Sequence, residues 1–323
     1  MDSATLAMAE PFLGEFIQVS TTEHFAIAHE AGANYVPGAG KTLEQAYTQF
    51  YGTFSRAGFE LTRSTDPFVW VCFSQQSQFN AYAMQVEGTD LSWLDGYYST
   101  LTNRVAVVEP SPRVSEQDKT TASSGPDRWA SSTATRRRRE DVLPMSGDTS
   151  QVDVARLTHE LAHQLAFNSG LQKRGVLYPF WVSEGLATNF EFEGPMGSGF
   201  EKRTTARRDC LVKARAAGEL VPLAQFVVQT SVPSNAAQSR RYYAQAWAFF
   251  QYLLTERSEG LRGYLHQVAT LPPGRRTAKV LRREFTDAFG SPEDLESSWS
   301  TFLDRQARLA SAPDDSASPA DDK

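Results

Sequence analysis

The stretch from 158 to 165 reads Thr-His-Glu-Leu-Ala-His-Gln-Leu and holds two of the chain's five histidines, His159 and His163. On a helix, residues four apart lie on one face, one turn from each other. Both imidazoles can then reach one metal ion at about 2.0–2.1 Å, the distance at which histidine binds zinc. The stretch therefore predicts half of a metal site.

A helix is expected here because apolar residues recur at spacings of three and four, at Val154, Leu157, Leu161 and Leu165. Ser150 and Asp153 resemble a capping box at its start. Glu160 would point to the side of the site, where a carboxylate can take a proton from water activated by the metal. The alternative is a pair of partly buried helical histidines without a metal.

A third ligand is expected between 179 and 191, which read Pro-Phe-Trp-Val-Ser-Glu-Gly-Leu-Ala-Thr-Asn-Phe-Glu. A catalytic zinc ion needs three protein ligands and an open fourth position. Glu184 is the natural third ligand, because a glutamate in an apolar, aromatic stretch is costly unless it is paired or binds a metal. A solvent-facing Glu184 is the alternative, and Glu191 and Glu193 compete for the role from a more polar context.

The pair of motifs resembles the signature of gluzincin metallopeptidases in the peptidase MA clan. Its first half is His159-Glu-Leu-Ala-His-Gln164 and its second half is Trp181-Val-Ser-Glu184-Gly-Leu-Ala. Aminopeptidase-N-type enzymes carry a similar pair, including an asparagine at the place of Asn168. The order is also similar to a bacterial domain-of-unknown-function family of peptidase MA-like proteins, which shares the segments at 22–25 and 96–98. The resemblance covers roughly residues 16–305.

The resemblance implies one zinc ion per chain with three ligands, namely His159, His163 and Glu184. It also implies that Glu160 is the general base. In gluzincins of this kind a tyrosine from a later helix stabilises the oxyanion, and the matching segment here offers Tyr243, with Tyr242 in reserve. A packing role for both tyrosines is the alternative.

Two further expectations concern the substrate. No segment resembles the Gly-Ala-Met-Glu-Asn feature that binds a substrate's amino terminus, so aminopeptidase activity is not implied. The strand at 104–108 precedes the motif helix, a position that in zincins is often the edge strand, and substrate would then bind by strand addition.

The remaining polar residues are given smaller roles. Thr188 or Asn189 could orient the ligand histidines through their second ring nitrogens. His24, His29 and His266 are interpreted as structural.

The fold class expected is α+β and zincin-like, with a small N-terminal mixed sheet and helices followed by a mainly helical part that carries the motif helix. Strands are predicted at 16–29, 67–73, 96–98 and 104–108. Besides the motif helix, helices are predicted at 42–57, 78–85, 179–192, 201–217, 239–256, 261–271, 278–289 and 292–309.

One peptidase-like domain is expected at 16–310, after an N-terminal extension at 1–15. Within it, an α/β part at 16–108 and a helical part at 150–310 flank a flexible insertion at 109–149, which holds the solvated run Arg136–Arg139. The residues from 311 to 323 are expected to form a disordered acidic tail.

Composition excludes some partners. The net charge of -6 and the pI near 5.5 argue against a nucleic-acid partner, and no apolar run is long enough for a membrane span. No signal peptide is seen, so the sequence as given predicts a cytoplasmic protein, and an exported one if it is a trimmed domain. Cys72 and Cys210 are expected to be free thiols. The oligomeric state is left open.

Three functions fit these motifs. The first is zinc-dependent hydrolysis of peptide bonds in a peptide or protein substrate, with metal-activated water, Glu160 as base and Tyr243 as oxyanion donor. The second is a non-catalytic zinc-binding or scaffold domain that retains the fold. The third is hydrolysis of a non-peptide amide or ester, which shares the same water chemistry and which the motifs do not separate from the first.

Overall fold

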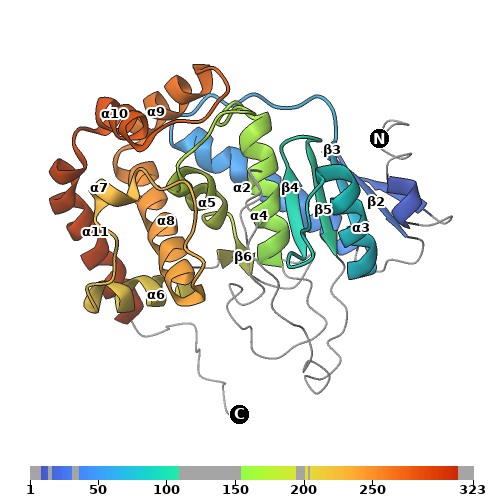
Figure 1. The fold of residues 1–323 in the computed structure, drawn as a ribbon, viewed down its shortest axis with the longest axis horizontal. Coiled ribbons are helices and arrows are strands. Elements are labelled where there is room, and N and C mark those ends of the chain that lie inside the picture. The colour runs from blue at the N-terminus through green and yellow to red at the C-terminus, as the bar shows by residue number, and fades with distance from the viewer. Residues whose placement is uncertain are drawn as a thin grey trace, which may run out of the picture.

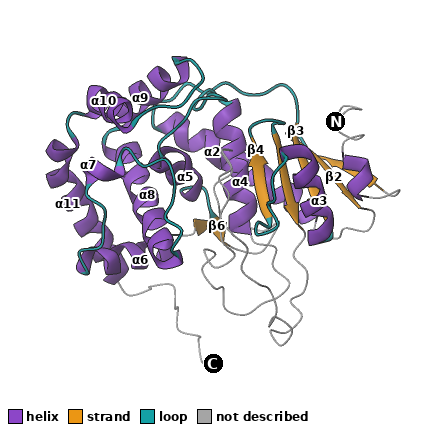
Figure 2. Ribbon diagram, in the orientation of Figure 1, coloured by secondary structure: helices purple, strands orange, loops and turns teal. Residues whose placement is uncertain are grey.

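The fold is an α+β arrangement in which a five-stranded mixed sheet lies beside a larger helical part (Figures 1 and 2). The computed structural model describes residues 9–13, 17–30, 36–108, 154–193, 201–202 and 204–311. The sheet consists of β1 (Ile17–Thr21), β2 (Phe25–Glu30), β3 (Phe68–Phe73), β4 (Gly96–Ser99) and β5 (Arg104–Val108). The fold class predicted from the sequence is confirmed.

The strand order is β1-β2-β3-β5-β4, with parallel pairs in the middle and an antiparallel strand at each end. Ala106 of β5 pairs with Val71 on one side and with Tyr97 on the other. The expectation that 104–108 is the edge strand is therefore wrong, because β4 takes that place. A tight turn explains the arrangement, since Asn103 adopts a left-handed φ of 58° and lets β5 fold back inside β4.

The alternation of side chains along the strands gives the sheet two buried faces. Trp70 and Val105 face one core, which they share with α2 (Val36–Arg56) and α4 (Val154–Asn168). Val71 and Ala106 face a second, smaller core beneath α3 (Gln76–Glu87) and the helical residues 9–13. A large apolar side chain contributes about 1.5–3 kcal/mol when fully buried, so both faces hold the helices against the sheet.

The helical part surrounds one short apolar helix, α5 (Phe180–Thr188), which α4 separates from the sheet (Figure 1). It also contains the short strands β6 (Phe192–Glu193) and β7 (Glu201–Lys202). The other helices are α6 (Thr205–Ala216), α7 (Leu223–Phe226), α8 (Ala236–Glu256), α9 (Ser258–Thr270), α10 (Ala278–Phe289) and α11 (Pro292–Ser311). A helix that is apolar all round belongs inside a core, and Trp181 of α5 is fully buried against the rings of Phe249, Tyr264 and Phe285.

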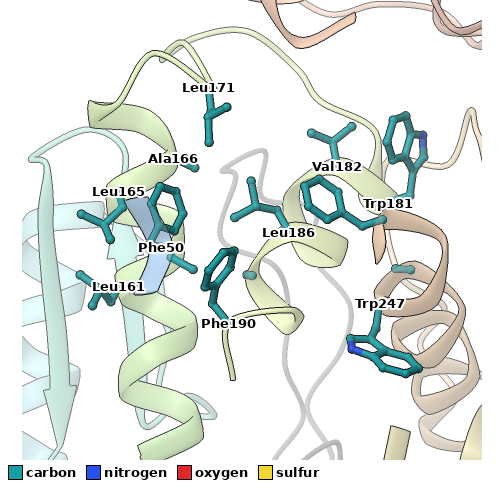
Figure 3. Packing of buried hydrophobic residues seen from close by; sticks show 14 of the residues in the cluster. Phe50, Leu161, Leu165, Ala166, Leu171, Trp181, Val182, Leu186, Phe190 and Trp247 are labelled. Atoms are coloured by element: carbon teal, nitrogen blue, oxygen red, sulfur yellow. The ribbon is translucent and has the colours of Figure 1, made fainter. Parts of the chain in front are cut away.

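Helix α5 packs between α4 and α8. Figure 3 shows Leu186 and Phe190 on the side facing Leu165 and Ala166 of α4, with Trp181 on the other side of α5. On the α8 side the backbones approach closely, since a Cβ added at Gly185 would lie 2.6 Å from the carbonyl oxygen of Ala246. A glycine next to Glu184 thus sets the distance between α5 and α8.

Several predicted boundaries need correction. The strand predicted at 16–29 is two strands, because Thr22 donates its N–H to Phe25 across a turn. The helix predicted at 179–192 ends at Thr188, and a strand follows at Phe192. Helix α2 begins earlier than predicted, at Val36. The elements α7, β6 and β7 were not predicted from the sequence.

Some expectations fall on residues outside the described ranges. These are the helix start at Ser150 and Asp153, the run Arg136–Arg139 with its insertion, and nearly all of the acidic tail. Within the described residues, neither Cys72 nor Cys210 forms a disulfide. Among the described residues no helix has the length and apolar character that crossing a bilayer requires.

Candidate metal centre

Three predicted ligands meet where α4 faces α5. His159 and His163 on α4 and Glu184 on α5 each offer one ligand atom, and these atoms lie within 4.8 Å of one another. The two Nε2 atoms are 3.1 Å apart. Each Nε2 atom is also 3.4 Å from one oxygen of Glu184. The two motifs, read separately along the chain, thus converge on one point.

The spacing of these atoms fits a shared metal ion. Four ligands placed tetrahedrally at 2.0–2.1 Å from zinc lie about 3.3–3.4 Å apart. The 3.1 Å between the two Nε2 atoms is close to that figure, and so is the 3.4 Å from each Nε2 atom to an oxygen of Glu184, a different oxygen for each histidine. Two imidazole nitrogens and one carboxylate oxygen are also the donor set of a catalytic zinc site that keeps one open position.

Burial makes this cluster costly without a cation. His159 is fully buried and Glu184 is 2% exposed. A buried carboxylate is unfavourable unless charge and hydrogen bonds compensate it. His163 keeps 13% of its side chain exposed, so the group has one solvent-facing side among otherwise buried ligands.

A carboxylate behind His159 fixes that ring. Nδ1 of His159 lies 2.8 Å from Oε1 of Glu191, which is buried just beyond the end of α5. Oε2 of Glu191 in turn accepts a hydrogen bond of 3.1 Å from Nε of Arg207, and a second one from the same guanidinium. Arg207 lies on α6, so a third helix supports the centre.

The ionisation of Glu191 sets the tautomer of His159. Burial by itself raises the pKa of Glu191, but the Arg207 guanidinium and the His159 hydrogen bond outweigh it and hold this pKa well below its usual range. A carboxylate can only accept, so Nδ1 of His159 carries the proton. Nε2 is then the ring nitrogen that faces His163 and Glu184, which is the orientation that a metal ligand requires.

The predicted role of Thr188 and Asn189 is wrong. The Thr188 hydroxyl donates to the main-chain carbonyls of Glu184 and Gly185. The Asn189 amide donates to the carbonyls of Gly185 and Trp247. Both side chains bind carbonyls of α5, because polar side chains one turn past Glu184 reach the helix's own carbonyls before they reach the histidines, and Asn189 also joins α5 to α8. Glu191, considered a competing ligand, supports His159 instead.

Glu160 lies beside the ligand group without belonging to it. Its side chain is 5% exposed, and Oε2 accepts a hydrogen bond of 3.0 Å from the main-chain N–H of Tyr98 on β4. A carboxylate buried next to the ligands and held by the sheet has the position that the sequence assigned to a general base. The contact with β4 carries no signal in the sequence, because its donor is a main-chain group.

The two tyrosines of α8 differ in their surroundings. The ring of Tyr243 packs against Phe180 at 5.1 Å and lies 5.8 Å from the guanidinium carbon of Arg207, the residue that binds Glu191. Tyr242 turns toward Phe226, at 6.1 Å between ring centroids. Tyr243 is therefore the tyrosine that lies next to Arg207, behind the Glu191–His159 pair.

The other histidines lie outside the centre. His24 is 2.6 Å from Glu44 and stacks on Tyr47. His29 contacts Ser20, while His266 is exposed on α9. The contacts of His24 and His29 join neighbouring elements, in keeping with the structural roles predicted for these two histidines.

Comparison with known proteins places the centre inside one family match. A family described as a protein of unknown function (DUF1570) matches residues 153–274, which is less than half of the chain. The matched segment runs from the start of α4 to the end of α9, so it contains all three ligand residues together with Glu191, Arg207 and Tyr243. No curated protein matches the chain.

Proposed function

We propose that this protein is a zinc-dependent hydrolase of peptide bonds. The observation that carries the proposal is the convergence of three ligand residues from two separate motifs, whose ligand atoms lie within 4.8 Å of one another, with the two Nε2 atoms 3.1 Å apart. His159, His163 and Glu184 would hold the ion. When bound, zinc supplies a Lewis acid that polarises a carbonyl group and lowers the pKa of water.

The side chains around the ligands supply the remaining chemistry. Glu160 takes the proton of the attacking water and later gives it to the leaving amine, which is the role of a general base that becomes a general acid. The hydroxyl of Tyr243 donates a hydrogen bond to the oxygen that gains negative charge, and such a donor is effective where water is excluded. Tyr243 is 6% exposed, which supports that role.

The choice of a peptide as substrate rests on the resemblance to gluzincins of the peptidase MA clan. The motif pair at 159–164 and 181–187 supports it. The substrate proposed is therefore a peptide or protein.

The test combines a zinc assay with a peptide-library cleavage profile on the wild type and on Glu160→Gln. We expect about one zinc ion per chain in both proteins, with cleavage lost in the variant by about 10²–10⁴-fold, the usual contribution of a general base. Glu60→Gln, on the exposed end of the loop after α2, is the matched control and should cleave like the wild type.

Each contrary outcome has a clear meaning. An unchanged rate in Glu160→Gln contradicts the assigned base. Stoichiometric zinc with no cleavage of any peptide by the wild type contradicts the peptidase and leaves the non-catalytic zinc-binding domain or a hydrolase of a non-peptide amide or ester. Cleavage that survives complete removal of zinc by a chelator contradicts the metal mechanism.

A further inference from the structure

The edge strand β4 turns one main-chain N–H toward the metal helix. Along β4, the carbonyls of Asp95 and Ser99 accept hydrogen bonds from Val108 and Asn103, so the odd-numbered residues face β5. The N–H of Tyr98 points the other way and donates to Oε2 of Glu160 at 3.0 Å. Because the donor belongs to the main chain, the position of β4 determines where this N–H lies relative to Glu160.

The side chain of Tyr98 anchors that position. Its ring stacks on Phe167 of α4 at 5.8 Å between centroids. Its hydroxyl donates to Oδ1 of Asn103 at 3.0 Å and accepts from Nη2 of Arg174 at 3.1 Å. Burial raises the pKa of this phenol although Arg174 opposes the shift, so the hydroxyl stays protonated and keeps donating.

The turn after β4 is joined to the end of α4 by paired amides. Asn103 donates to Oδ1 of Asn168 at 3.0 Å, and Asn168 donates back to Oδ1 of Asn103 at 2.8 Å. Nη2 of Arg174 lies 2.6 Å from Oδ1 of Asn103 and 2.9 Å from Oδ1 of Asn168. Gln164 continues the network, since its amide donates to the carbonyl of Asn103 and accepts from the indole of Trp70.

This network, here named the β4 clasp, consists of Tyr98, Asn103, Gln164, Asn168 and Arg174. We propose that the β4 clasp positions Glu160 by holding the N–H of Tyr98 against its carboxylate, and that Asn168 and Arg174 are therefore positioning residues for hydrolysis. A carboxylate next to a cation can swing onto the metal as an additional ligand. The hydrogen bond from the N–H of Tyr98 holds one oxygen of Glu160 at β4, so the side chain stays beside the ligand group.

The catalytic part of this inference rests on the proposed function, whereas the positioning part does not. Substitutions in the β4 clasp leave the three metal ligands unchanged. They should therefore alter the orientation of Glu160 without altering zinc binding. Displacing a reacting group by about 1 Å can cost about 10²-fold in rate. We expect Asn168→Ala and Arg174→Ala to lower kcat about 10- to 100-fold, with KM and zinc content close to those of the wild type.

The first measurement needs no activity. Residue-resolved hydrogen exchange of the metal-free protein should show a protected Tyr98 amide. Exchange should become at least about tenfold faster in Glu160→Ala, which lacks the acceptor, and in Asn168→Ala, while Glu160→Gln retains an acceptor oxygen and stays protected. Arg174→Lys keeps a cationic donor, so it should recover part of the protection and part of the kcat that Arg174→Ala loses.

The matched control removes another half-buried arginine, one on an element outside the β4 clasp. Arg282 of α10 lies 3.8 Å from Glu293 and donates to the carbonyl of Ala224, so Arg282→Ala should lower thermal stability without changing exchange at Tyr98 or kcat. If Tyr98 exchange in Asn168→Ala and Arg174→Ala matches that of the wild type or of Arg282→Ala, the inference is overturned. A protein that hydrolyses nothing but shows the expected exchange pattern loses the proposed function and keeps the positioning of Glu160.

Discussion

Helix α4 contacts α5 and β4 in opposite ways, and the contrast shows how the candidate centre is built. Toward α5 the contact is apolar and close, with Leu165 and Ala166 opposite Leu186. Toward β4 it is a network of amides, a phenol and a guanidinium. The apolar side brings the proposed metal ligands together, while the polar side holds Glu160, the proposed base. The proposed metal binding and base orientation thus depend on different forces and can be perturbed one at a time.

The largest expected effect comes from removing a ligand. His163→Ala should abolish stoichiometric zinc binding, because two ligands cannot replace a three-ligand site. His266→Ala is the matched control, since that histidine is exposed on α9. Zinc content by elemental analysis after dialysis distinguishes them. If His163→Ala retains one zinc ion per chain, the ligand assignment is wrong and the comparison between the two sides of α4 loses its basis.

A smaller effect is expected from the carboxylate behind His159. Glu191→Gln should weaken zinc binding about 10- to 100-fold, the usual cost of losing an outer-shell partner, because the amide no longer forces the proton onto Nδ1. Arg207→Met should act in the same direction, since Arg207 keeps Glu191 ionised. Competition with a chromogenic chelator measures the affinity.

The neighbouring carboxylate provides the control for this prediction. Glu193 is exposed on β6, so Glu193→Gln should bind zinc like the wild type. Complete loss of zinc in Glu191→Gln together with retained zinc in Glu184→Gln would contradict the assignment, because it would make Glu191 the third ligand.

The contrast between Glu184 and Glu191 also shows what the sequence can predict. His159 and His163 are predictable because helical periodicity converts a spacing of four into a shared face. Glu184 is predictable because a charge in an apolar helix needs a partner. Glu191 lies beyond Thr188, the last residue of α5. Outside a helix, the spacing of residues along the sequence does not predict which way a side chain points. The role of Glu191 depends on Arg207, which belongs to another helix.

The sheet shows the same limit. Alternating apolar residues predict β3 and β5, but strand order depends on the turn at Asn103, and an asparagine with a left-handed φ is not recognisable from its identity alone. The β4 clasp joins residues up to 76 positions apart. Its contact with Glu160 is made by a main-chain group, which every residue except proline possesses. Long-range polar contacts of this kind cannot be recognised from any short stretch of the sequence.

The smallest expected effect tests the close packing of α5, the helix on the apolar side of α4. Gly185→Ala places a Cβ 2.6 Å from the Ala246 carbonyl oxygen and 3.0 Å from Cβ of Phe250, so α5 and α8 must separate. We expect the free energy of unfolding to fall by about 1–3 kcal/mol, as for other overpacked cores. Chemical denaturation of the metal-free proteins measures it.

Gly263 on α9 is the matched control, because a Cβ there meets no atom within 4 Å. Gly263→Ala should raise the free energy of unfolding by about 0.5–1 kcal/mol, since alanine loses less backbone entropy in a helix. Equal stabilisation by both substitutions would show that α5 and α8 are not in close contact at Gly185. A destabilised Gly185→Ala that also binds zinc more weakly, with Tyr98 exchange unchanged, would show that close packing on the α5 side sets the ligand spacing independently of the β4 clasp.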